Sequence, residues 1–215
     1  YDGSLLIYLY TPTPTDDLTT LFRGTLALNP NSTVSFSIND TTYSGYGTAD
    51  QQVTSQKTTD YYYEWDANSA HAKMTVDGKL TRDDYYIPEG TKVNQYSYLT
   101  GSLEYVDWWK SLITSNLFTW YNFYTSEMVG IADEGDGAFS LTGKALDRML
   151  LILTQADETY EGTDFGSMQV FYDEEAGILT GTATKATAQG SLTRVLNLSL
   201  TISDIGTTEI DFPSK

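Results

Sequence analysis

The side chains best suited to hold a ligand in this chain are aromatic and apolar. Aromatic rings offer large apolar surfaces that can line a pocket for an apolar molecule or stack on a sugar ring, and they equally well build an ordinary core. Tyr61, Tyr63 and Trp65 stand at alternate positions, and two tryptophans are adjacent. The candidate ligand-binding residues are Phe36, Tyr63, Trp65, Met74, Trp108, Trp109, Trp120, Met149 and Leu198.

Residues that carry acid–base, nucleophilic or metal chemistry are scarce. The chain has no Cys and 1 His, which excludes thiolate nucleophiles and Cys-ligated metals and nearly excludes zinc. His71 alternates with Ala70 and Ala72, so it is predicted to lie on the solvated face of a strand. We therefore predict no catalytic residues, no metal and no cofactor.

Acidic clusters are the remaining source of chemistry. Residues 132–138 gather three carboxylates around two glycines, which could hold Ca²⁺, but the loop lacks the EF-hand spacing and is predicted to be a solvated turn. Asp83 and Asp84 could be imagined as the paired acids of a glycosidase. Neighbouring residues on a strand point to opposite faces, so these two carboxylates should diverge.

The charge of the chain limits its partners. Twelve Lys and Arg against 29 Asp and Glu give 12 − 29 = −17, which disfavours nucleic acid and anionic bilayers. No apolar stretch approaches the roughly 18 residues of a membrane span. The first residue is Tyr1, and we expect that a leader has been removed and that the protein is extracytoplasmic.

Alternating apolar residues predict that most of the chain is antiparallel sheet. The clearest examples are Val34, Phe36 and Ile38, and the series from Leu196 to Ile202. Thr and Tyr are abundant, and both suit a pleated, half-buried surface. Asp77-Gly78 is typical of a tight hairpin turn between two such strands.

Two stretches have helical rather than strand periodicity. Residues 103–117 place Val106, Trp109 and Ile113 on one face, and a second helix should carry Leu146, Met149, Leu150 and Leu153. A short helical turn is expected after Asp16. The prediction is an α+β fold: residues 1–15 form an N-terminal extension, and residues 16–215 form one domain in which two or three helices cover the concave face of a large curved antiparallel sheet, a half-barrel.

Two segments resemble the LolA-like and LppX/LprG-like bacterial lipoproteins. Residues 203–213 (SDIGTTEIDFP) place an s-x-x-G turn and an I-x-x-P exit after the last strand, and residues 172–180 (YDEEAGILT) are similar to the acidic hairpin of that superfamily. The order of elements is similar over residues 17–213. The resemblance implies a half-barrel of about eleven strands closed by helices, an upstream lipid anchor, an apolar cavity and no catalytic residues.

The functional prediction combines these expectations. The chain should be a non-enzymatic, extracytoplasmic and lipid-anchored protein that binds a hydrophobic or amphiphilic, lipid-like molecule between sheet and helices. It should not bind nucleic acid and should meet a membrane only through its anchor; its oligomeric state is left open. The alternative is a carbohydrate-binding or adhesion module that uses surface Tyr and Trp side chains.

Overall fold

The computed structural model describes residues 31–66, 68–107, 130–154, 160 and 162–212. The N-terminal extension, the turn expected after Asp16, and Trp108, Trp109 and Trp120 lie outside these residues. The elements are β1 (Ser32–Ser44), β2 (Gln52–Trp65), β3 (Ala70–Val76), β4 (Lys79–Glu89), β5 (Lys92–Ser97), β6 (Ser102–Asp107), β7 (Ile131–Gly135), β8 (Ala138–Thr142), α3 (Gly143–Leu153), α4 (Gly162–Phe165), β9 (Ser167–Asp173), β10 (Ile178–Gln189) and β11 (Leu192–Ser203).

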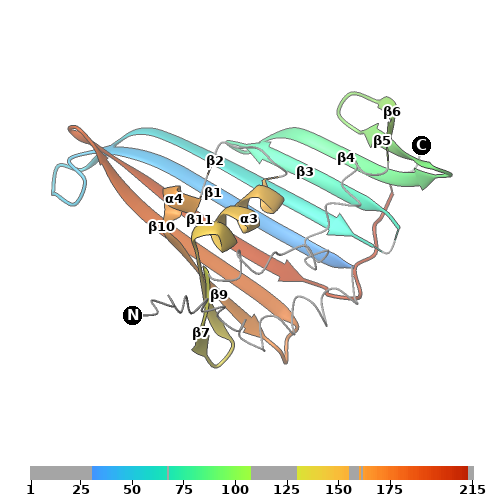
Figure 1. Cartoon of the computed structure of the whole chain (residues 1–215). Coiled ribbons are helices and arrows are strands. Elements are labelled where there is room, and N and C mark those ends of the chain that lie inside the picture. Colours follow the sequence, from blue (N-terminus) through green and yellow to red (C-terminus); the bar gives the residue numbers. More distant parts are fainter. Residues whose placement is uncertain (1–30, 67, 108–129, 155–159, 161, 213–215) are drawn as a thin grey trace, which may run out of the picture.

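All eleven of these strands belong to one antiparallel sheet, in the order β6-β5-β4-β3-β2-β1-β11-β10-β9-β8-β7. Neighbouring strands are consecutive in the chain except where β1 pairs with β11, so two meanders meet at the centre and β6 and β7 form the opposite edges. Figure 1 shows the sheet strongly twisted, as expected for long antiparallel strands. The predicted large antiparallel sheet is confirmed.

The two faces of the sheet differ in chemistry because apolar residues alternate with polar ones. Val34, Phe36 and Ile38 pair across the centre with Ile202, Leu200 and Leu198, and all six are buried. We call the side that carries them the helix-covered face, because α3 lies on it (Figure 1). The opposite side, which carries Ser35, Ser37 and their neighbours, is the outer face.

The hairpin turns follow the residues that favour them. Asp77 and Gly78 have φ of 51° and 75°, the left-handed pair that a tight hairpin needs, as the sequence indicates. The first half of β2, residues 52–57, is exposed on both faces, so it has no apolar alternation by which it could be recognised. The β1–β2 and β10–β11 hairpins project together from one end of the sheet (Figure 1).

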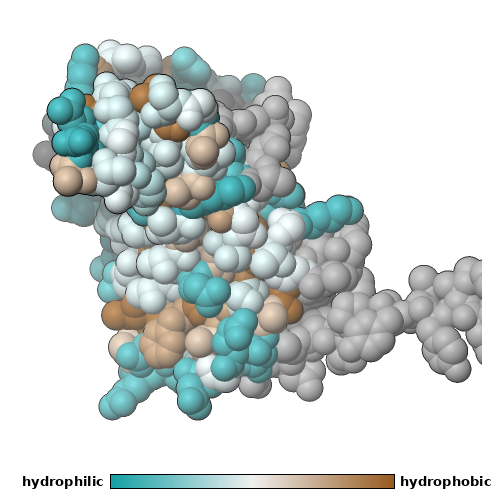
Figure 2. Space-filling model, turned by 90° about the vertical axis from the view of Figure 1, so that its left-hand side faces the viewer, coloured by the Kyte–Doolittle hydropathy of each residue, from teal (hydrophilic) through white to brown (hydrophobic). Residues whose placement is uncertain are grey.

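That end of the molecule is seen in Figure 2, where pale and teal atoms predominate and the brown areas are small and separate. Apolar side chains are therefore not concentrated on this side of the protein. They are found instead in the buried cluster beneath α3.

Helix α3 is confirmed, and its apolar stripe is fully buried: Leu146, Met149, Leu150 and Leu153 each have 0% exposure. Residues 103–107, the start of the other predicted helix, are instead strand β6. Leu103 and Tyr105 pair with Tyr96 and Asn94 of β5, so their alternation has the period of a strand. The described residues contain one helix of 11 residues and one of 4, where two or three covering helices were expected. Neither has the length and apolar character needed to cross a bilayer.

Candidate ligand-binding face

A line of aromatic rings runs along β2 on the helix-covered face. Tyr61, Tyr63 and Trp65 occupy alternate positions and therefore point to the same side of the sheet. The centroids of Tyr61 and Tyr63 are 6.3 Å apart, those of Tyr63 and Trp65 are 5.4 Å apart, and Phe36 of β1 lies 5.4 Å from Tyr61. These contacts make a continuous aromatic surface across two central strands.

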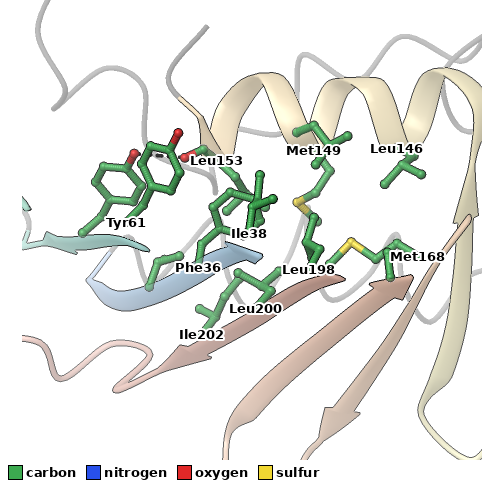
Figure 3. Close-up of a cluster of buried hydrophobic side chains, with 14 of the residues drawn as sticks. Phe36, Ile38, Tyr61, Leu146, Met149, Leu153, Met168, Leu198, Leu200 and Ile202 are labelled. Carbon is green, nitrogen blue, oxygen red and sulfur yellow. Dashed lines mark hydrogen bonds between the residues drawn. The ribbon is translucent and has the colours of Figure 1, made fainter. Parts of the chain in front are cut away.

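Helix α3 packs its buried stripe on the other side of the same cluster (Figure 3). Met149 extends from the helix toward Leu198 of β11, and Met168 reaches the cluster from β9. The Tyr63 hydroxyl donates a hydrogen bond of 2.9 Å to the carbonyl oxygen of Leu153, drawn as a dashed line. Because the last carbonyls of a helix lack partners within it, this bond ties the end of α3 to β2.

Five of the nine candidate ligand-binding residues therefore come together in one cluster: Phe36, Tyr63, Trp65, Met149 and Leu198. Met74 of β3 is partly buried and packs at the border of the cluster. Trp108, Trp109 and Trp120 lie outside the described residues. Their use as a ligand-binding site stays a prediction.

The apolar side of the sheet is much wider than α3. Buried side chains extend from Val93 on β5 to Leu141 on β8, a span of nine neighbouring strands. With strands about 4.8 Å apart this distance is roughly 38 Å. An 11-residue helix is only about 16 Å long at 1.5 Å per residue. Helix α3 can cover less than half of this apolar surface.

Two arginine–aspartate pairs lie on the helix-covered face at the sides of the aromatic line, and no sequence pattern indicates them. Arg82 Nε donates to Asp84 Oδ2 at 3.0 Å on β4. Arg194 of β11 holds Asp40 of β1 through two donors at 2.9 and 2.6 Å. The second pair joins residues 154 positions apart, which only the register of the sheet brings together. Arg82 and Arg194 thus lie on this face as members of ion pairs rather than as single charges.

His71 is not the solvated side chain that the sequence predicts. It does lie on the outer face, but its exposure is only 2%. Nδ1 is 2.7 Å from Glu64 Oε2 and Nε2 is 2.8 Å from Asp83 Oδ1, so both nitrogens face carboxylates. Both ring nitrogens of His71 are therefore occupied by carboxylate partners. The hydrogen bond from His71 is the largest of the influences that lower the pKa of Glu64.

Stacking of an aromatic ring on the imidazole explains why His71 is buried on the outer face. The Tyr85 ring stacks on the imidazole, with centroids 4.0 Å apart and planes 8° from parallel. Phe212, near the end of the described chain, lies 5.8 Å from Tyr85. Burial, followed by the charge of Asp83, raises the pKa of Tyr85 to about 12. The alternation of Ala70–Val76 identifies the face of His71 correctly but contains no information about this cover.

The remaining acidic residues have local structural roles. Asp83 and Asp84 diverge as expected, toward His71 and Arg82. Residues 132–138 cover the end of β7, the turn at residues 136–137 and the first residue of β8; the Asp133 carboxylate accepts from the Gly135 N–H and Glu134 accepts from the Ser140 hydroxyl. Within the described ranges, no group of three or more His, Asp or Glu side chains is arranged to hold a metal ion.

Taken together, the fold is a twisted eleven-stranded antiparallel sheet with one face apolar and partly covered by a helix. It is similar to the crystal structure of the Mycobacterium tuberculosis lipoprotein LppX, with 10% sequence identity over 92% of this chain and 99% of that chain, and a TM-score of 0.39. No protein-family model matches the sequence, and a search of curated proteins found no significant match. At this level of similarity the function of the chain has to be inferred from its own residues.

Proposed function

We propose that this chain is a non-enzymatic, extracytoplasmic protein that holds a hydrophobic or amphiphilic, lipid-like molecule against the helix-covered face. The observation that supports this most is the continuous apolar and aromatic face that nine neighbouring strands present on the side of α3. The described side chains of this face are buried within the chain itself. We propose that an apolar guest enters between the sheet and its cover by displacing part of that cover, which exposes apolar side chains to the guest rather than to water.

The side chains at the site suit an apolar guest. Met149 and Met168 have flexible, polarizable side chains that adapt to ligands of varying shape. The charged groups at the borders are neutralised in the pairs Arg82–Asp84 and Arg194–Asp40, so they can meet the polar end of an amphiphile without leaving a single charge buried.

The environment of His71 supports a role without catalysis. A general base must present a nitrogen to its substrate, and both nitrogens of His71 are bonded to carboxylates. The location outside the cytoplasm and the upstream lipid anchor remain proposals that rest on composition and on the segments at residues 172–180 and 203–213.

Native mass spectrometry tests the proposal directly. The chain, secreted from a bacterial host and purified without detergent, should carry an additional mass of lipid size that disappears when the protein is unfolded. Repeated spectra of the folded protein with no additional mass, together with no binding of a fluorescent fatty acid, would exclude the carrier role.

Two lysine variants on the same strand identify the face that binds. Met74 is half-buried at the border of the cluster, and Thr75 is its neighbour on the outer face. Met74→Lys places a charge where the guest should lie and should weaken fatty-acid binding by about tenfold, equivalent to about 1.4 kcal/mol. Thr75→Lys is the matched control and should bind as the wild type does. Equal binding by both variants would place the ligand elsewhere.

A further inference from the structure

The outer face carries an exposed aromatic surface at the β4–β6 end of the sheet, on the side opposite the proposed lipid site. Tyr98, Leu103 and Tyr105 are 57%, 52% and 61% exposed, and Ile87 is 39% exposed. Large apolar patches on a protein surface usually mark a binding site. We name this surface the outer tyrosine patch, which consists of Tyr85, Ile87, Tyr96, Tyr98, Leu103 and Tyr105.

The register of the strands shows that these side chains are neighbours. Tyr85 pairs with Tyr96, and Tyr96 pairs with Leu103, which gives one row across β4, β5 and β6. Ile87, Asn94 and Tyr105 form the next row. Residues that are paired across an antiparallel sheet point to the same face, and adjacent strands are about 4.8 Å apart. The patch is therefore continuous, and four of its six side chains carry phenol hydroxyls next to apolar surface.

The inner edge of the patch is fixed in position. Tyr85 is held between the His71 imidazole and the Phe212 ring, and His71 is itself held by Glu64 and Asp83. The backbone N–H of Tyr98 donates to the carbonyl oxygen of Asp83 at 2.8 Å, which ties the β5–β6 turn to β4. A pre-organised aromatic surface loses little conformational freedom when it binds a ligand.

The polarity of the patch indicates what it could bind. None of its six side chains is charged at neutral pH, and the nearby carboxylates of Asp83 and Glu89 already bond to His71 and Asn94. No carboxylate of this group is left to recognise a basic partner. A net charge of −17 repels polyanions and opposes the approach of a second copy.

The phenol hydroxyls add a polar requirement. Tyr98 and Tyr105 are 57% and 61% exposed, and each carries a hydroxyl at the end of an apolar ring. The side chain of Asn94, between Ile87 and Tyr105, is already engaged, because its amide nitrogen donates to Glu89 Oε2 at 2.6 Å. A partner with hydroxyl groups and apolar C–H surfaces matches both the phenol oxygens and the rings.

We propose that the outer tyrosine patch is a binding site for an uncharged glycan chain. Sugar rings present C–H groups on their faces, which stack on tyrosine, and hydroxyls at their edges, which bond to the phenol oxygens. This site is independent of the lipid-binding proposal, because it lies on the other face of the sheet.

Affinity electrophoresis and calorimetry with the full chain test this site. The probes are soluble neutral oligosaccharides of the cellulose, chitin, amylose and mannan types. The wild-type protein should bind at least one of these oligosaccharides. The double variant Tyr98→Ala/Tyr105→Ala should bind the same oligosaccharide at least about tenfold more weakly. Tyr46→Ala is the matched control, because Tyr46 is 45% exposed in the β1–β2 turn and should not contribute.

Three results would overturn the proposal. The first is failure of every probe to bind the folded wild-type protein at millimolar concentration. The second is binding that the double variant retains in full. The third is self-association of the wild type, measured by sedimentation equilibrium, that the double variant abolishes, because the patch would then be an interface between two copies. All substituted side chains are exposed, so unchanged thermal unfolding should accompany each variant.

Discussion

Single residues on the outer face show how strongly local cover changes the chemistry of a side chain. Glu64 accepts hydrogen bonds from His71 and from the Tyr62 hydroxyl, at 2.7 and 2.8 Å. The bond from His71 is the main reason that the pKa of Glu64 lies below its usual value of 4.5. The folded protein therefore holds this carboxylate ionised more firmly than the unfolded chain does.

This difference predicts how stability depends on pH. A carboxyl whose pKa is lowered by folding contributes stability above its unfolded pKa, and that contribution is lost as the pH falls through the lower folded pKa. Between about pH 6 and about pH 3 the wild type should lose thermal stability, and Glu64→Gln should lose less of it because glutamine does not titrate. Differential scanning fluorimetry across this range measures both curves. Glu175→Gln, in an exposed turn, should follow the wild type, and a Glu64→Gln curve parallel to it would contradict the argument.

At the scale of elements, helix α3 offers a comparison between two neighbouring leucines. Leu150 is fully buried, and its neighbour Leu151, about 100° further round the helix, is 38% exposed. Leu150→Ala should lower the free energy of unfolding by about 3 kcal/mol, because it leaves a cavity. Leu151→Ala should change it by less than about 0.5 kcal/mol. Urea unfolding measures both values; equal losses would mean that α3 does not pack as described.

The elements also show which kinds of pattern the sequence could reveal. Three segments were predictable because each has one buried face: Val34–Ile38, the Leu196–Ile202 series and the apolar stripe of α3. In each of them apolar residues recur with the period of the element, two for a strand and about 3.6 for a helix. The beginning of β2 was not, since residues 52–57 are exposed on both faces. Residues 103–107 were misassigned because Leu103 and Tyr105 are large apolar residues on an exposed face. For the site, sequence reasoning found the aromatic line but missed the partners of His71 and Arg194, which depend on register and on cover from distant segments.

At the scale of the whole molecule, the two faces of the sheet differ in the side chains that they carry. The helix-covered face carries apolar and aromatic residues from nine strands. The outer face carries hydroxyl and amide side chains at its centre and the outer tyrosine patch at one end. The described side chains of the helix-covered face are buried within the chain itself. If a guest molecule binds this face only in the folded state, the stability of the fold must depend on the guest.

This dependence predicts a measurable change on delipidation. A ligand that binds only the folded state at 100 times its Kd stabilises that state by about 2.7 kcal/mol, which corresponds to about 5–10 °C in Tm for a domain of this size. Protein stripped of lipid by unfolding, organic extraction and refolding should unfold at a temperature lower by about this amount. Adding a fatty acid should restore the Tm of the wild type but not that of Met74→Lys, whose binding face carries a charge. Equal Tm values before and after extraction, in a refolded protein with native circular dichroism, would mean that the chain itself supplies the whole cover of the apolar face.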